Sequence, residues 1–388
     1  MRRLLLLVSA LVLVDTMLYA ALTPLLPHYA ERFGLSKQGA GALVAAYAIG
    51  ALVGGLPGGI AAARLGPRRA VLIGLALMTV AGVAFAFADD PWTLGLARFG
   101  QGFGSALTWS GALTWLVGAT PRERRGEAIG RAMGAAIFGA LLGPVLGAAA
   151  SFAGTRLVFS CVAALGVVLA VWALRSPTVP GDPQPLRALG RAFHEPRIGA
   201  GLWLMVLPAL LFGILSVLAP LTFARAGWGA VAIGAVFLVG ASLEGLLSPV
   251  FGRLSDRRGR LYPLRIAVGA SAVVTAVLAV GGPAPLTAVL VVCSALAFGG
   301  FWTPAMALIA DGAEHARLAQ GLAFGLMNAA WAAGNSVGPG AGGLLADRAG
   351  DAAPYLIASA LCFATLAALK LTSPDETETP ERSPARTV

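Results

Sequence analysis

Twelve long apolar stretches, separated by short charged or Pro- and Gly-containing segments, constrain the fold of this chain more than any other feature. A helix that crosses a bilayer core needs about 20 apolar residues, and each stretch is close to that length. Only 12% of the 388 residues are charged, whereas about 25% is usual for a soluble protein. The predicted spans are 4–27, 39–63, 70–88, 92–117, 127–151, 156–175, 199–224, 229–252, 261–281, 285–310, 319–345 and 354–371. We therefore expect an all-α membrane protein with twelve transmembrane helices and a surface covered by lipid.

The same composition argues against several other classes of protein. The net charge is +10, but the arginines punctuate apolar runs instead of gathering on a hydrated face, so no nucleic-acid partner is expected. The three cysteines form no CxxC pair and the three histidines are scattered over predicted loops, so neither a metal site nor a Ser/His/Asp triad has support. The chain has two lysines, Lys37 and Lys370, and neither follows the Gly-x-x-x-x-Gly of a P-loop. We expect no enzyme, no cofactor and no bound metal.

Basic residues are distributed unequally over the two predicted faces of the membrane. Of the 28 Lys and Arg residues, 22 lie on the face that carries both termini, 5 lie on the other face, and Arg98 lies within a span. The positive-inside rule then predicts cytoplasmic termini. The start resembles a signal peptide, but its apolar stretch continues to Pro27 and eleven spans follow, so we expect an uncleaved first helix. The expected location is the plasma (cytoplasmic) membrane, with a multi-pass topology.

A polar segment with several prolines and arginines divides the spans six and six. The predicted organisation is an N-terminal six-helix bundle (1–175), a cytoplasmic linker (176–198), a C-terminal six-helix bundle (199–371) and a disordered cytoplasmic tail (372–388).

Two motifs recur in both halves at nearly one interval. The segment that begins at Gly59 is repeated from Gly252, an offset of 193 residues. The motif G-x-x-x-G-P-x-x-G begins at Gly139 and again at Gly334, an offset of 195 residues. Such a parallel repeat predicts two pseudo-symmetric six-helix bundles that alternate access around a site between them.

The segment Gly252–Arg260, G-R-L-S-D-R-R-G-R, resembles the cytoplasmic signature G-x-L-a-D-r-x-G-r of the major facilitator superfamily. The resemblance covers essentially the whole chain and implies a gate latch in which Asp256 accepts hydrogen bonds from a helix N-terminus and from arginines. An echo, G-L-L-A-D-R-A-G, lies at Gly343–Gly350, and the first-half copy has Ala63 in place of the acid, which predicts a weaker latch. A basic loop alone would explain the arginines but not the ordered Gly and Asp. The predicted gate residues are Gly59, Arg64, Gly66, Arg68, Gly252, Asp256, Arg257, Gly259 and Arg260.

In the fifth span, the repeated glycine run resembles the antiporter motif of drug/proton exporters. Small residues at this spacing let two helices pack backbone to backbone, and a proline removes a backbone donor and bends the helix. Ordinary packing of small residues remains the alternative. The motif residues are Gly139, Gly143, Pro144 and Gly147.

Asp15 and Glu244 are the two acids well inside predicted spans. A low-dielectric surrounding favours a neutral carboxyl group, so these two are candidates for taking up and releasing protons. The alternatives are a packing hydrogen bond for Asp15 and an interhelical contact for Glu244. Arg98 and Gln101 resemble the family's R-x-x-q-G-x-g motif, which is linked to proton coupling, although an Arg near a helix end can also extend outward to water.

The run around Asp15 and Tyr19 resembles the first helix of bacterial multidrug exporters and vesicular amine carriers. Tyr19 lies one helical turn from Asp15, and an acid beside an aromatic ring suits an organic cation. Asn328 stands where the amine carriers have an acid, and it can still hydrogen-bond a substrate. Trp331, like Trp109 and Trp302, is a candidate wall of the cavity, although Trp also serves as an interfacial anchor.

The sequence as a whole predicts a secondary active transporter that works as a monomer in the lipid bilayer. We expect proton-coupled efflux (antiport) of small amphipathic or cationic molecules by alternating access, with protons that neutralise Asp15, Glu244 or both. Two alternatives stay open, a sugar or metabolite carrier of the same fold and a non-transporting membrane sensor or assembly factor.

Overall fold

The computed structural model describes residues 2–121, 124–180, 190, 194–258, 261–316 and 320–371, which are helical almost throughout and contain no strand in these ranges. The helices of the first half are α1 (Arg2–Ala20), α2 (Leu22–Arg32), α3 (Lys37–Arg64), α4 (Pro67–Ala86), α5 (Pro91–Gly118), α6 (Arg125–Ala153) and α7 (Thr155–Leu174). Those of the second half are α9 (Pro196–Arg225), α10 (Ala230–Arg258), α11 (Leu261–Val280), α12 (Ala284–Gly299), α13 (Trp302–His315), α14 (Gln320–Ala349) and α15 (Ala352–Leu371).

These helices make up the twelve predicted spans, because α1 with α2 and α12 with α13 each form one span. Of the described spans, 10 are long and apolar enough by composition alone to cross a membrane. The other two are α5 and α14. The predicted tail and most of the predicted linker lie outside the described residues, and α9 already begins at Pro196.

The first and tenth spans each consist of two helices separated by a short break. The first span is interrupted at Ala21 and the tenth between Gly299 and Trp302. In each case a proline, Pro24 or Pro304, follows as the third residue of the next helix. Proline has no N–H to give to the preceding turn, so the helix breaks there.

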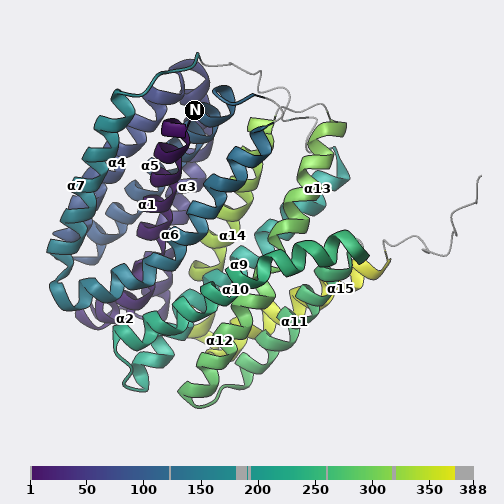
Figure 1. Ribbon diagram of the computed structural model, residues 1–388. Helices are drawn as coiled ribbons and strands as arrows, with labels where there is room; N and C mark the ends of the chain where they lie inside the picture. The colour runs from purple at the N-terminus through teal and green to yellow at the C-terminus, as the bar shows by residue number, and fades with distance from the viewer. Residues whose placement is uncertain are drawn as a thin grey trace, which may run out of the picture.

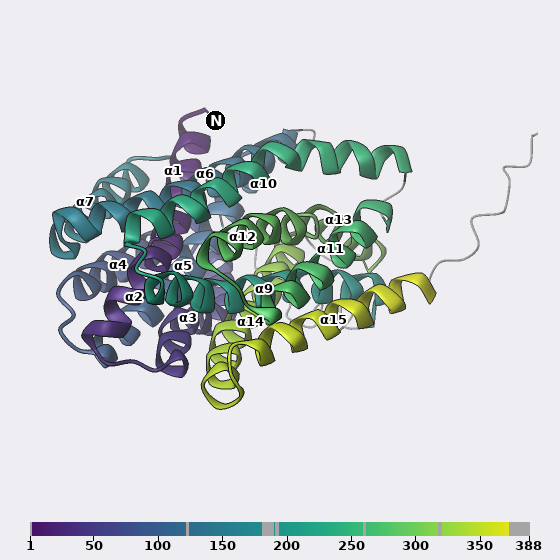
Figure 2. The ribbon, with the colours of Figure 1, turned by 90° about the horizontal axis from the view of Figure 1, so that it is seen from below.

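The two halves lie side by side, with α1–α7 in purple to blue and α9–α15 in green to yellow (Figures 1 and 2). The repeated glycine run performs equivalent packing in both. A Cβ atom added at Gly139 would collide with the Leu13 carbonyl of α1, and one added at Gly143 with the Ala20 Cβ of α1. One added at Gly334 or Gly338 would collide with a backbone carbonyl of α9. This correspondence confirms the predicted pseudo-symmetry between the fifth and eleventh spans.

Contacts between the halves are made mainly by α3 with α14 and by α6 with α10, and these pairs lie side by side in both views (Figures 1 and 2). A Cβ atom at Gly41 of α3 would overlap the Pro339 carbonyl, and one at Gly343 of α14 would overlap the Lys37 carbonyl. Lys37 and Gly41 lie in the first two turns of α3, and Gly343 lies in the last two turns of α14. The start of α3 and the end of α14 lie at the end of the molecule opposite the N-terminus (Figure 1). The halves are therefore joined backbone to backbone at that end.

Candidate functional site

Asp15 is the most deeply enclosed carboxylate among the described residues of the first half, with 2% of its surface exposed. The Tyr47 hydroxyl donates to its Oδ1 at 3.0 Å, and the Trp109 indole N–H donates to its Oδ2 at 2.6 Å. Ser105, also buried, adds a side-chain hydrogen bond. The donors come from α3 and α5 and the acid from α1, so three spans meet at this carboxylate.

Close packing of α3 on α5 brings Tyr47 within reach of the acid. A Cβ atom at Gly102 would collide with the Tyr47 carbonyl, and one at Gly50 would collide with the Phe99 carbonyl. The glycine of the R-x-x-q-G run is thus needed for the helices to approach, and this contact places the Tyr47 hydroxyl beside Asp15.

Arg98 points into the first half and does not extend outward to water, because only 2% of its surface is exposed. Its guanidinium donates to the carbonyls of Leu18 and Tyr19, both at 3.3 Å, and to Gln101 Oε1 at 3.2 Å. These two carbonyls belong to the last turn of α1, where the break before α2 leaves acceptors free and the helix dipole is negative. Arg98 therefore caps α1.

The same guanidinium lies over the Tyr47 ring, with its central carbon 4.8 Å from the ring centroid. Tyr47 thus contacts the arginine with its face and Asp15 with its hydroxyl. Within the described part of the chain, Arg98 Nε and Gln101 Nε2 are buried donors without a hydrogen-bond partner. Donors of this kind are available to a bound molecule or a water.

Aromatic rings extend the site from the first half to the second. The Tyr19 ring centroid lies 5.1 Å from that of Tyr47 and 5.3 Å from that of Trp331, which belongs to α14. Asn335, one turn further along α14 and 3% exposed, hydrogen-bonds the Tyr19 side chain. The interface between the halves, where α3 packs on α14 and α6 on α10, is called the seam below. The structure brings five predicted residues into one cluster that crosses the seam: Asp15, Tyr19, Arg98, Gln101 and Trp331.

Glu244 and Asn328 lie outside this cluster. Glu244, on α10, packs over Gly299, where an added Cβ atom would lie 2.5 Å from the Glu244 Cγ, and it shares a side-chain hydrogen bond with Trp302. It is therefore placed at the break between α12 and α13. Asn328 is half-buried on α14, and none of the described hydrogen bonds includes it.

Of the predicted gate residues of the first half, Gly59 lies in the last two turns of α3, and Arg64, Gly66 and Arg68 lie at the turn between α3 and α4. Gly59 and Arg64 are exposed, and Gly66 adopts φ +89°, which permits the turn. Arg68 donates to the Ser176 carbonyl at 3.3 Å, so this turn is tied to the segment after α7.

The second-half copy is only partly described. Gly252 and Asp256 belong to α10, but the surroundings of Gly252 and of the Asp256 side chain lie outside what the structure describes. Gly259 and Arg260 lie outside the described residues. Arg257 is exposed. The predicted hydrogen bonds of Asp256 therefore remain a prediction.

Comparison with known proteins places this geometry in a family. The sequence model of the Major Facilitator Superfamily matches residues 8–324. The chain is 31% identical over 251 residues to the chloramphenicol resistance protein of Streptomyces lividans, which covers 61% of this chain and 62% of that protein. It is 34% identical over 136 residues to the multi-drug resistance efflux pump PmrA homolog of Lactococcus lactis, covering 34% and 32%. These matches span less than two thirds of the relatives' own lengths.

Solved structures show the fold over nearly the whole chain. The D-xylose-proton symporter superposes with a TM-score of 0.77 at 17% identity, covering 96% of this chain and 98% of that one. The nucleoside transporter NupG gives a TM-score of 0.73 at 16% identity, covering 95% and 98%. This polytopic helical protein therefore belongs to the Major Facilitator Superfamily of transporters.

Proposed function

We propose that this protein is a proton-coupled exporter of small amphipathic or cationic molecules, with Asp15 as its principal proton site. The main support is the position of Asp15, which is buried and hydrogen-bonded to the first of three aromatic rings in contact, the last of which belongs to the second half. Tyr47 hydrogen-bonds the carboxylate at 3.0 Å and contacts Tyr19, which contacts Trp331. A change in the charge of Asp15 therefore acts on the seam that must rearrange during transport.

A cation and a proton would compete at this site for physical reasons. The carboxylate attracts a cation, and the neighbouring ring faces add cation–π attraction, whereas a protonated Asp15 has no charge to offer. A ligand shifts a conformational equilibrium only by its different affinity for the two states. Competition of this kind supplies that difference, so that proton uptake on one side releases the substrate and proton loss on the other readmits it.

The names of two relatives, a chloramphenicol resistance protein and a multidrug efflux pump, support export as the direction. With cytoplasmic termini, as the arginine distribution predicts, the end at which the halves are joined faces outward. In the proposed cycle, the substrate enters from the cytoplasm and the proton from outside. Glu244 is a second candidate proton site, and Asp256 with its arginines biases the inner gate.

Everted membrane vesicles test the coupling. Tetraphenylphosphonium or chloramphenicol, added to acid-loaded vesicles, should release luminal protons from those that contain the wild-type protein. We expect the double variant Asp15→Asn, Glu244→Gln to abolish this release. Asp89→Asn, which removes an exposed acid paired with Arg32, is the matched control and should leave it unchanged. Full proton release by the double variant would contradict the proposal.

A sugar or metabolite carrier of the same fold is the second candidate. It is favoured by one relative named as a probable sugar efflux transporter, from Helicobacter pylori, which is 28% identical over 106 residues, 27% of this chain and 27% of that protein. Parallel export assays with labelled sugars and with organic cations distinguish the two candidates. Export of sugars alone would favour the second, and binding without export of either would favour a sensor.

A further inference from the structure

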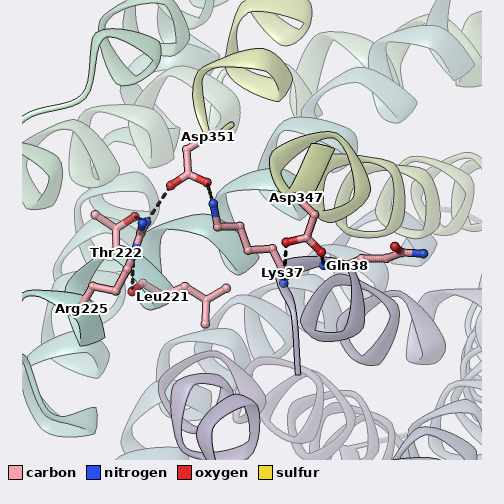
Figure 3. Close-up of polar contacts among 7 residues, drawn as sticks. All are labelled: Lys37, Gln38, Leu221, Thr222, Arg225, Asp347 and Asp351. Atoms are coloured by element: carbon pink, nitrogen blue, oxygen red, sulfur yellow. Dashed lines mark hydrogen bonds and ion pairs between the residues drawn. The ribbon is translucent and has the colours of Figure 1, made fainter. Parts of the chain in front are cut away.

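Four charged residues meet at the start of α3 (Figure 3), near the point where α14 ends. Lys37 Nζ lies 2.6 Å from Asp351 Oδ1, and Arg225 Nη2 lies 2.6 Å from Asp351 Oδ2. Lys37 begins α3 in the first half, whereas Arg225 ends α9 and Asp351 lies between α14 and α15 in the second. One carboxylate thus holds a cation from each half.

A second carboxylate of the second half caps a helix of the first. Asp347 Oδ1 accepts from the Lys37 backbone N–H at 3.0 Å, and its Oδ2 accepts from that of Gln38 at 2.7 Å (Figure 3). Ser36 accepts from the Gly39 N–H at 3.3 Å. The first N–H groups of a helix have no partner within it and attract a negative charge. The N-terminus of α3 is therefore completed by the other half.

The backbones come unusually close beside these charges. A Cβ atom at Gly343 would collide with the Lys37 carbonyl, so glycine is required there. Gly343 and Asp347 belong to the run G-L-L-A-D-R-A-G, which echoes the cytoplasmic signature. The echo therefore has the two physical features predicted for that signature, a glycine that permits close approach and an acid on a facing helix N-terminus, but at the opposite end of the molecule.

We propose that Lys37, Asp347 and Asp351 form an outer latch that holds the two halves together at the extracellular end, and that Arg225 is the partner Asp351 keeps when the latch opens. Arg225 also donates to Thr222 Oγ1 at 3.0 Å and the Leu221 carbonyl at 3.4 Å, so it is held within its own half. When the halves separate, Lys37 leaves with the first half while the Arg225–Asp351 pair moves as a unit. Opening thus leaves Asp351 paired within its own half.

The latch does not respond to extracellular protons over the ordinary range. Burial alone raises the pKa of Asp351, but hydrogen bonds from Lys37 and Arg225, together with their charges, outweigh burial and hold the pKa below its ordinary value of 3.8. Tyr355 and Asp347 are the other titratable groups near this carboxylate. Asp351 therefore stays charged, and opening must be driven from elsewhere, which in the proposed cycle is the Asp15 site.

A buried reporter at the seam can measure the opening of this latch. Ala45 is 2% exposed on α3, two turns inside Lys37, and its Cβ faces Gly340 of α14. In a background without the native cysteines, an Ala45→Cys reporter should react slowly with a membrane-impermeant maleimide added to intact cells. Lys37→Met and Asp347→Ala should raise the labelling rate roughly 2- to 30-fold, the factor expected for loss of a cap or a partly buried pair.

Matched variants separate the latch from a general loss of structure. Lys37→Arg keeps the charge, and Asp347→Asn keeps the capping oxygen, so both should label more slowly than Lys37→Met and Asp347→Ala respectively. Arg225→Met should not raise labelling, because the Lys37–Asp351 bond remains. Arg32→Met removes an ion pair within the first half, that with Asp89, and should behave as the parent.

Three results would overturn the latch: unchanged labelling in Lys37→Met and Asp347→Ala, an equal increase in Arg32→Met, or an increase seen only in inverted vesicles. The assay uses neither substrate nor proton flux. Although the latch rests on the proposed transport cycle, its failure is therefore distinguishable from failure of proton coupling, which the everted-vesicle assay measures.

Discussion

The proposed proton exchange depends on one buried carboxylate, Asp15, and on the Tyr47 hydroxyl that donates to it at 3.0 Å. An acid inside an apolar span is costly unless it is paired, and this cost alone selects Asp15 and Glu244 from the sequence. Its donor Tyr47 was not predicted, because the contact joins different spans. A signal was present nevertheless, since Tyr47 is the one side chain with a hydrogen-bonding group in the predicted span 39–63. Asn335 was missed for the same reason.

Tyr47→Phe tests whether the hydroxyl acts on the acid. The change keeps the ring that packs on Tyr19 and Arg98 and removes the donor 3.0 Å from Asp15. A hydrogen bond to a charged group is worth roughly 1.5–3 kcal/mol. We expect substrate-driven proton release to fall about tenfold or more, with little change in thermal stability. An unaltered rate would show that this hydroxyl has no part in coupling.

Asp351 provides a pH test of stability. Its pKa lies below 3.8, so its ion pairs stabilise the protein fully above that value and are lost as the pH falls through the lowered pKa. Asp351→Asn should therefore lower the free energy of unfolding by about 1 kcal/mol at every pH between about 5.5 and about 8. Thermal unfolding in detergent measures this difference, and a deficit that varies across this range would contradict the assignment.

Helix α6 shows how element packing follows from the glycine pattern. The repeated run predicted a backbone-to-backbone contact, and the structure identifies the partner of α6 as α1. The breaks within the first and tenth spans were not predicted, because average apolarity does not register a single proline. The break after α1 matters for the site, since it frees the two carbonyls that Arg98 caps.

Two valine substitutions on α6 test whether a glycine is needed only where the helix touches α1. A Cβ atom at Gly139 would collide with Thr16 and the Leu13 carbonyl, whereas one at Gly134 would meet nothing within 4 Å. Gly139→Val should lower stability by roughly 1–3 kcal/mol, as overpacking does, and it should sharply reduce transport. Gly134→Val should fold and transport like the wild type. Thermal unfolding and vesicle transport are measured on both variants. Equal stability of Gly139→Val and Gly134→Val would contradict the close packing of α6 on α1.

The molecule as a whole joins its halves at one end and places the acid cluster beside the seam. Apolar length and the internal repeat were sufficient to predict twelve spans in two related bundles, because both are properties of local sequence. The seam was beyond prediction, because it depends on how the halves meet. In the sequence, nothing distinguishes three charged residues near the ends of spans from ordinary loop charges: Lys37, Asp347 and Asp351. Their contacts appear only when α3 and α14 are packed together.

If substrate and proton compete at Asp15, binding of the substrate alone must release protons. Purified protein in weakly buffered detergent solution, mixed with tetraphenylphosphonium, should release protons in the wild type and in Asp89→Asn. We expect Asp15→Asn to lose most of this release and the double variant Asp15→Asn, Glu244→Gln to lose all of it. Undiminished release from the double variant, with binding retained, would contradict proton exchange at these two acids.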